Sequence, residues 1–99
     1  MKTAEKSPEK PLSAQVALIT GASRGIGLAI GRGLGRMGAR LSLCARGEQA
    51  LNDAVAALRG EGLEALATPA DIRHAGDVAE LVRKTNVHLG EIDILVNNA

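Results

Sequence analysis

The chain has 99 residues, no aromatic side chain and a formal net charge of +1. This length allows one small domain, and its core must be built from Leu, Ile, Val, Ala and Met. The nearly balanced charge gives no indication of nucleic-acid or membrane binding. No apolar run is long enough to span a membrane and none marks a signal peptide, so we expect a cytoplasmic protein.

Residues 1–13 have the composition of a polar leader. The segment is rich in Lys and Glu and contains two prolines, which favours a solvated, disordered extension. We therefore expect the folded part to occupy residues 14–99.

Strand-like and helix-like segments alternate from residue 16 onward. Short apolar runs predict strands at 16–19, 40–45, 64–68 and 93–96. Apolar spacing and terminal glycines predict helices at 24–37, 48–59 and 75–89. This alternation predicts an α/β fold, a Rossmann-type doubly wound parallel sheet. A strand order of 3-2-1-4 places the first two helices on one face, the third on the other, and a ligand crevice at the carboxyl ends of the strands.

The spacing of apolar residues also predicts which side chains face the sheet. These are Ile26, Ile30, Leu34 and Met37 in the first helix, Leu51, Val55 and Leu58 in the second, and Val78, Leu81, Val82 and Leu89 in the third. Gly31, Gly33 and Gly35 each weaken the first helix by about 1 kcal/mol relative to Ala, which suggests close contact with the sheet or with a cofactor. Cys44 lies in an apolar run and is expected to be a small buried hydrophobe.

The segment Thr20-Gly21-Ala22-Ser23-Arg24-Gly25-Ile26-Gly27 joins the first strand to the first helix. A strand, a glycine turn and a helix start form an anion site, because backbone N–H groups lack partners there and the helix dipole adds positive charge. The spacing Gly-x3-Gly-x-Gly differs from the usual dinucleotide pattern and from a P-loop. We assign Gly21 to the tight turn, Gly25 to phosphate approach and Gly27 to close helix–strand packing. The alternative is a glycine-rich turn without a ligand.

Residues 20–27 resemble the cofactor motif of the short-chain dehydrogenase/reductase family. Leu95-Val96-Asn97-Asn98-Ala99 matches a second family motif, Asn-Asn-Ala-Gly, up to its last residue. The resemblance covers residues 14–99, and members of the family are considerably longer. It implies the N-terminal, cofactor-binding half of such an enzyme, similar to the 3-oxoacyl-carrier-protein reductases and truncated after the fourth strand.

The end of the second strand bears on the choice of cofactor. An NAD site usually carries an acidic residue there, whereas this chain has Ala45 followed by Arg46. Arginine can hold a 2′-phosphate through a bidentate fork, and Arg24 lies in the glycine loop. In the resembled family, basic residues at these two positions mark a preference for NADP, which is therefore the expected cofactor. The alternative is that both are ordinary surface arginines.

The resemblance implies further cofactor contacts. Asp71 would accept a hydrogen bond from the adenine amino group with Ile72 packed nearby, Asn98 would lie near the ribose, and Asn97 would stabilise the sheet. Without the resemblance, Asp71 is typical of a turn or helix start and the asparagines of a turn. The expected cofactor-binding residues are Gly21, Ser23, Arg24, Gly25, Ile26, Gly27, Arg46, Asp71, Ile72, Asn98 and Ala99. His74 and His88 have no partner at metal-ligand spacing, so we expect no metal site.

The family transfers a hydride between nicotinamide and a carbonyl or alcohol substrate, using a Ser, a Tyr and a Lys. This chain has no tyrosine, and none of its serines maps onto the catalytic one, so we assign no catalytic residue. We expect the intact parent to be an NADP-dependent, homo-oligomeric oxidoreductase that acts on a small molecule. We expect residues 1–99 expressed alone to be poorly stable and inactive. Two alternatives remain: a non-catalytic dinucleotide-binding module, and another Rossmann-type protein such as a methyltransferase, which predicts an acidic residue ending the second strand.

Overall fold

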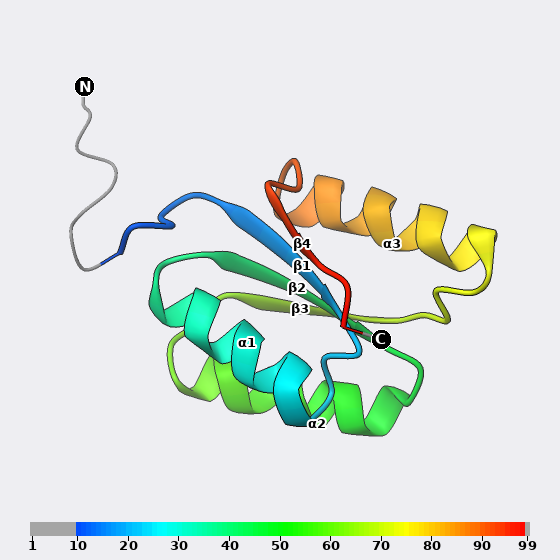
Figure 1. The fold of residues 1–99 in the computed structure, drawn as a ribbon, viewed down its shortest axis with the longest axis horizontal. Coiled ribbons are helices and arrows are strands. Elements are labelled where there is room, and N and C mark those ends of the chain that lie inside the picture. Colours follow the sequence, from blue (N-terminus) through cyan, green and yellow to red (C-terminus); the bar gives the residue numbers. More distant parts are fainter. Residues whose placement is uncertain (1–9, 99) are drawn as a thin grey trace.

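The computed structural model describes residues 10–98, which form a four-stranded parallel sheet between two layers of helices (Figure 1). The strands are β1 (Val16–Thr20), β2 (Arg40–Ala45), β3 (Ala65–Pro69) and β4 (Ile94–Val96), and the helices are α1 (Gly25–Arg36), α2 (Glu48–Gly60) and α3 (Ala75–His88). The strand order is β3-β2-β1-β4. The predicted fold and strand order are confirmed, and each predicted boundary lies within one residue of the observed one.

Helices α1 and α2 cover one face of the sheet, and α3 covers the other (Figure 1). The buried side chains form two clusters, one on each face of the sheet, because successive residues of a strand point to opposite faces. Ile19, Leu41 and Leu43 pack in the larger cluster with the apolar residues predicted for α2, all of which are buried. A smaller cluster under α3 contains Leu18 and Cys44. Since β1 and β2 are covered on both faces, all of their residues except Arg40 are buried. The buried hydroxyl of Ser42 in β2 is paired with that of Thr85 in α3 at 2.7 Å.

The apolar face predicted for α1 is wrong at both of its ends. Ile26 is 72% exposed and Met37 is 41% exposed. The buried residues of this helix are instead three glycines spaced four apart, Gly27, Gly31 and Gly35. The helix therefore meets the sheet along a stripe of glycines, with larger side chains on its flanks.

The glycine stripe of α1 brings the helix backbone close to the strands. A Cβ atom at Gly35 would lie 2.9 Å from Leu41 Cδ1, and one at Gly31 would lie 3.4 Å from Ile19 Cδ1. Gly33 has open space around its Cα, so the close contact expected there is absent. Larger residues on this stripe would push the helix outward, which explains why the apolar side chains cannot occupy it.

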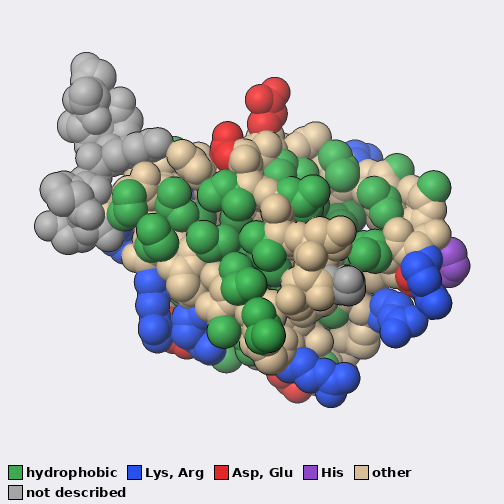
Figure 2. Space-filling view, viewed as in Figure 1, with side chains coloured by type: hydrophobic (Ala, Val, Ile, Leu, Met, Phe, Trp, Pro, Cys, Tyr) green, Lys and Arg blue, Asp and Glu red, His purple; other side chains and the backbone are tan. Residues whose placement is uncertain are grey.

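The outer edge of the sheet at β4 is partly apolar on its surface. Within residues 10–98 this strand pairs only with β1, and Leu95 is 64% exposed. On the α3 side, Leu81 and Leu89 are buried as predicted, whereas Val78 and Val82 are half-buried and line an apolar hollow of about 300 Å³ together with Leu95. Figure 2 shows hydrophobic side chains over the middle of the face on which β4 and α1 lie.

Part of the segment predicted as a leader packs on the domain. Leu12 N donates a hydrogen bond to Met37 O at 2.8 Å, and the Leu12 side chain contacts the larger hydrophobic cluster. The described structure thus begins before the predicted boundary at residue 14. The leader prediction for residues 1–9 falls outside the described residues. None of the helices within residues 10–98 has the length and apolar character needed to cross a bilayer.

Candidate nucleotide-binding site

The parallel register brings the carboxyl ends of β1, β2 and β3 to one edge of the sheet. Thr20 pairs with Cys44, and Cys44 pairs with Thr68, so the loops after these strands begin side by side. The loop after β3 is fixed to the end of β2 because Ala70 N donates a hydrogen bond to Ala45 O at 3.0 Å. Ligands of open α/β sheets bind at this edge.

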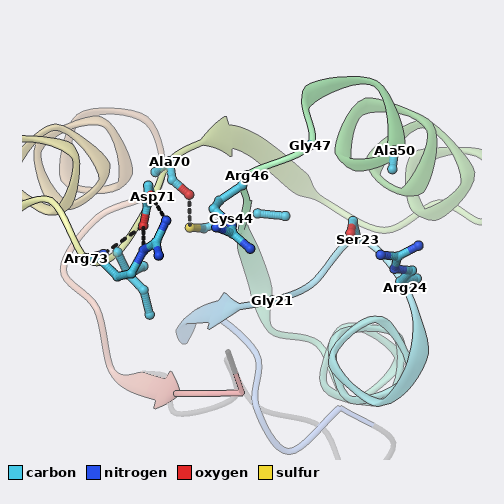
Figure 3. Close-up of a pocket in the computed structure, with 12 residues that line it drawn as sticks. Gly21, Ser23, Arg24, Cys44, Arg46, Gly47, Ala50, Ala70, Asp71 and Arg73 are labelled. Carbon is cyan, nitrogen blue, oxygen red and sulfur yellow. Dashed lines mark hydrogen bonds and ion pairs between the residues drawn. The ribbon is translucent and has the colours of Figure 1, made fainter.

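A pocket of about 670 Å³ lies between these loops, within the range of small-molecule sites (Figure 3). Figure 3 shows Asp71 and Arg73 at one end, Ser23 and Arg24 at the other, and Arg46 between them. The lining includes six predicted cofactor-binding residues: Gly21, Ser23, Arg24, Arg46, Asp71 and Ile72. The structure thus gathers residues from three separate loops around one hollow.

Gly25, Ile26 and Gly27 form the first turn of α1, next to Arg24, and do not line the pocket themselves. Gly21 and Gly25 both have φ of +60°, the left-handed region that glycine adopts without strain. No side chain caps the N-terminus of α1, and its first turn carries no acidic residue. The positive end of the helix dipole is therefore available to an anion at the side of the pocket.

Asn98 lies against the glycine loop and does not line the pocket. Its Nδ2 donates a hydrogen bond to Gly21 O at 3.2 Å. The neighbouring Asn97 accepts a hydrogen bond at its Oδ1 from Thr20 Oγ1, at the end of β1, at 3.2 Å. A Cβ atom at Gly27 would lie 2.3 Å from Gly21 O and 2.7 Å from Asn98 Nδ2. The close helix–strand packing predicted at Gly27 is therefore present. Ala99 lies outside the described residues.

Two arginines of the pocket lining have no acidic partner in the described structure. Arg24 and Arg46 are exposed, and neither makes an ion pair with any residue from 10 to 98. By contrast, Arg73 is paired with Asp71. The pocket therefore carries two guanidinium groups available to an anionic ligand, one on the glycine loop and one after β2.

Asp71 is held by Arg73 at the far end of the pocket. Arg73 Nε donates to Asp71 Oδ1 at 3.0 Å, Arg73 Nη2 donates to Oδ2 at 2.8 Å, and the backbone N of Arg73 donates to Oδ1 at 3.0 Å. These hydrogen bonds hold the pKa of Asp71 well below its usual range, so the carboxylate is ionised. Arg73 is not among the residues predicted from the sequence; its signal there is an arginine two residues after an acidic residue that follows a strand.

Cys44 lies at the floor of the same region and is 1% exposed, which confirms the prediction of a buried thiol. Its Sγ donates a weak hydrogen bond to Ala70 O at 3.7 Å. Burial, and then the nearby carboxylates of Asp77 and Asp71, raise the pKa of Cys44. A protonated, buried thiol is a poor nucleophile, so Cys44 acts as an apolar part of the wall.

The histidines lie at the two ends of α3. His74 precedes the first residue of the helix and His88 is its last residue. Within residues 10–98, no group of His, Cys, Asp and Glu side chains is arranged to hold a metal ion.

Residues 15–99 match the sequence model of the short chain dehydrogenase family. The chain belongs to this family. It is 44% identical over 95 residues to peroxisomal 2,4-dienoyl-CoA reductase of Arabidopsis thaliana, and 45% identical over 85 residues to a putative ketoacyl reductase of Streptomyces coelicolor. These matches cover 94% and 86% of this chain but 32% and 33% of the two proteins. This short-chain dehydrogenase sequence thus spans about a third of the length of these relatives.

Solved structures of the same family share the fold. L-sorbose reductase from Gluconobacter frateurii, complexed with NADPH and L-sorbose, matches with a TM-score of 0.87 and 38% identity over 92% of this chain and 35% of that one. A variant of actinorhodin polyketide ketoreductase with NADPH matches with a TM-score of 0.84 and 45% identity, over 86% and 33%. Both of these neighbours were solved with NADPH, the phosphorylated form of the cofactor.

Proposed function

We propose that residues 10–98 bind the adenosine half of NADP(H) in an oxidoreductase of the short-chain dehydrogenase family. One observation carries the choice of cofactor: Arg24 and Arg46 line the pocket without an acidic partner in the described part of the chain. The position that commonly carries an acidic residue in NAD sites is occupied by Ala45 and Arg46. A 2′-phosphate fits two free guanidinium groups, whereas a 2′-hydroxyl would leave both unused.

Each end of the pocket has a different chemical role in this proposal. The uncapped N-terminus of α1 binds the pyrophosphate, and the open space at Gly25 admits it close to the backbone. Arg24 and Arg46 bind the 2′-phosphate. The ionised carboxylate of Asp71 accepts a hydrogen bond from the base, and Ile72 adds an apolar contact beside it.

When bound, the nicotinamide cofactor would supply hydride-transfer chemistry, to a carbonyl as NADPH or from an alcohol as NADP. The residues described here bind and orient the adenosine half, which is remote from the nicotinamide. The chain contains no tyrosine, the residue type expected to donate the proton, so we assign no proton donor within residues 1–99. We propose a small-molecule carbonyl or alcohol as the substrate and a homo-oligomer in the cytoplasm as the working form. Family membership favours this activity over a methyltransferase.

The cofactor preference is tested by isothermal titration of NADPH and NADH into the full-length protein. A charge-assisted hydrogen bond contributes about 1.5–3 kcal/mol. Two partly exposed arginines should therefore favour NADPH by about 2 kcal/mol, or roughly thirtyfold in affinity. Equal affinities, or tighter binding of NADH, would contradict the assignment of the two arginines to a 2′-phosphate.

A further inference from the structure

Asp71 is held in one orientation from two directions. Arg73 donates to both carboxylate oxygens on one side. On the other side, the backbone N of Asp71 donates to Asp77 Oδ2 at 2.9 Å, which ties the loop to the first turn of α3. The Asp71 side chain is 17% exposed while that of Arg73 is 70% exposed, so the arginine lies over the carboxylate on its solvent side.

The hydrogen bonds to Asp71 occupy most of the acceptor positions of its carboxylate. An ionised carboxylate offers about four lone-pair positions, and Arg73 fills three of them with Nε, Nη2 and its backbone N–H. One acceptor position is left for a donor that enters the pocket. Because the carboxylate is already fixed, a ligand that donates to it does not have to order the side chain on binding.

We propose that Arg73 is a positioning residue of the nucleotide pocket, which holds Asp71 oriented toward a single N–H donor of the bound base. The proposal rests on the proposed function, because it takes the ligand of this pocket to be an adenosine nucleotide. Arg73 acts through Asp71: its own guanidinium is engaged by the carboxylate, unlike those of Arg24 and Arg46.

The chain offers a matched control for this pair. Arg83 binds both oxygens of Glu80 in the same way, with Nε–Oε1 at 2.9 Å and Nη2–Oε2 at 2.6 Å. Arg83 is about as exposed as Arg73, at 61% against 70%, but its pair lies on α3 and does not line the pocket. Loss of an exposed arginine that binds both oxygens of a carboxylate is therefore matched between Arg73→Ala and Arg83→Ala, and the two variants differ in whether that carboxylate belongs to the pocket.

The experiment titrates 2′,5′-ADP into the full-length protein and into Arg73→Ala, Arg73→Lys and Arg83→Ala, with a thermal melt of each. We expect Arg73→Ala to bind roughly fivefold more weakly and Arg83→Ala to bind as the wild type does, at similar melting temperatures. Arg73→Lys keeps the charge but loses the planar fork, so its affinity should fall between the two. Equal affinities of Arg73→Ala and Arg83→Ala would overturn the proposal. Failure of the wild type to bind 2′,5′-ADP would overturn the proposed function instead.

The pH profile separates positioning from a general loss of structure. In Arg73→Ala the pKa of Asp71 should rise toward its ordinary value, since the hydrogen bonds that lower it are gone. The affinity ratio of wild type to variant should therefore grow as the pH falls from about 6 to about 4. His74, Asp77 and Cys44 lie near Asp71, and Arg46 lines the same pocket. These groups and the ligand phosphates are the same in both proteins, so the ratio isolates the effect of Arg73. A ratio independent of pH would overturn the proposal.

Discussion

Replacing Gly27 with alanine is expected to abolish tight nucleotide binding and to destabilise the domain by about 3 kcal/mol. The new Cβ atom would lie 2.3 Å from Gly21 O and 3.0 Å from Gly21 C, both of them backbone atoms that cannot rotate away. Either α1 or the glycine loop must move, and the loop carries one wall of the pocket. Chemical denaturation and titration of NADPH into the full-length protein measure the two effects.

Gly33→Ala is the matched control in the same helix. A Cβ atom there meets nothing within 4 Å. Since alanine stabilises a helix relative to glycine, this variant should gain about 0.5–1 kcal/mol and keep its NADPH affinity. If Gly27→Ala has the stability and the affinity of Gly33→Ala, the close packing at Gly27 has no role in the site.

Replacing Arg46 with aspartate is expected to reverse the cofactor preference. The variant loses a guanidinium group that binds the 2′-phosphate and gains a carboxylate that repels it. A carboxylate at the end of β2 can also accept a hydrogen bond from the ribose 2′-hydroxyl, which favours NADH. We expect NADPH affinity to fall by about 100-fold, equivalent to about 3 kcal/mol, while NADH affinity rises. Calorimetric titration of both cofactors into wild type and variant gives the ratio directly.

Arg83→Asp controls for the change in net charge, because it alters the charge equally at a position outside the pocket. It should leave the ratio of NADPH to NADH affinity unchanged. An identical ratio in Arg46→Asp and in the wild type would remove Arg46 from the cofactor site.

The architecture of this domain is predictable from the sequence because local and long-range signals agree. Glycines stand at the ends of the helices, and the strands are short apolar runs between them. Once the alternation is recognised, right-handed crossovers restrict the strand order, and the structure has that order. The grouping of Gly21, Arg46 and Asp71 follows from the same reasoning, since the three residues come after neighbouring parallel strands.

The face of α1 could not be predicted from apolar periodicity. That method searches for large side chains, whereas this helix packs through the absence of side chains at Gly27, Gly31 and Gly35. Ile26 and Met37 have the right spacing but stand on the outside. Glycines four residues apart were visible in the sequence, but only the distance to the strands shows which of them face the sheet and which, like Gly33, face solvent.

The hydrogen bonds between Arg73 and Asp71 also could not be predicted from the sequence. The hydrogen bonds to Asp71 depend on the conformation of the loop between β3 and α3 and on the rotamer of a long, exposed side chain. Neither has a periodic signature. The position of Asn98 likewise depends on the contact between the end of β4 and the glycine loop, which are far apart in the sequence.

The crystal structure of the full-length protein with bound NADP tests the central claim most directly. We expect the 2′-phosphate within hydrogen-bonding distance of Arg24 and Arg46, the pyrophosphate at the N-terminus of α1, and the adenine beside Asp71. A cofactor bound elsewhere, or a 2′-phosphate in contact with neither arginine, would contradict it.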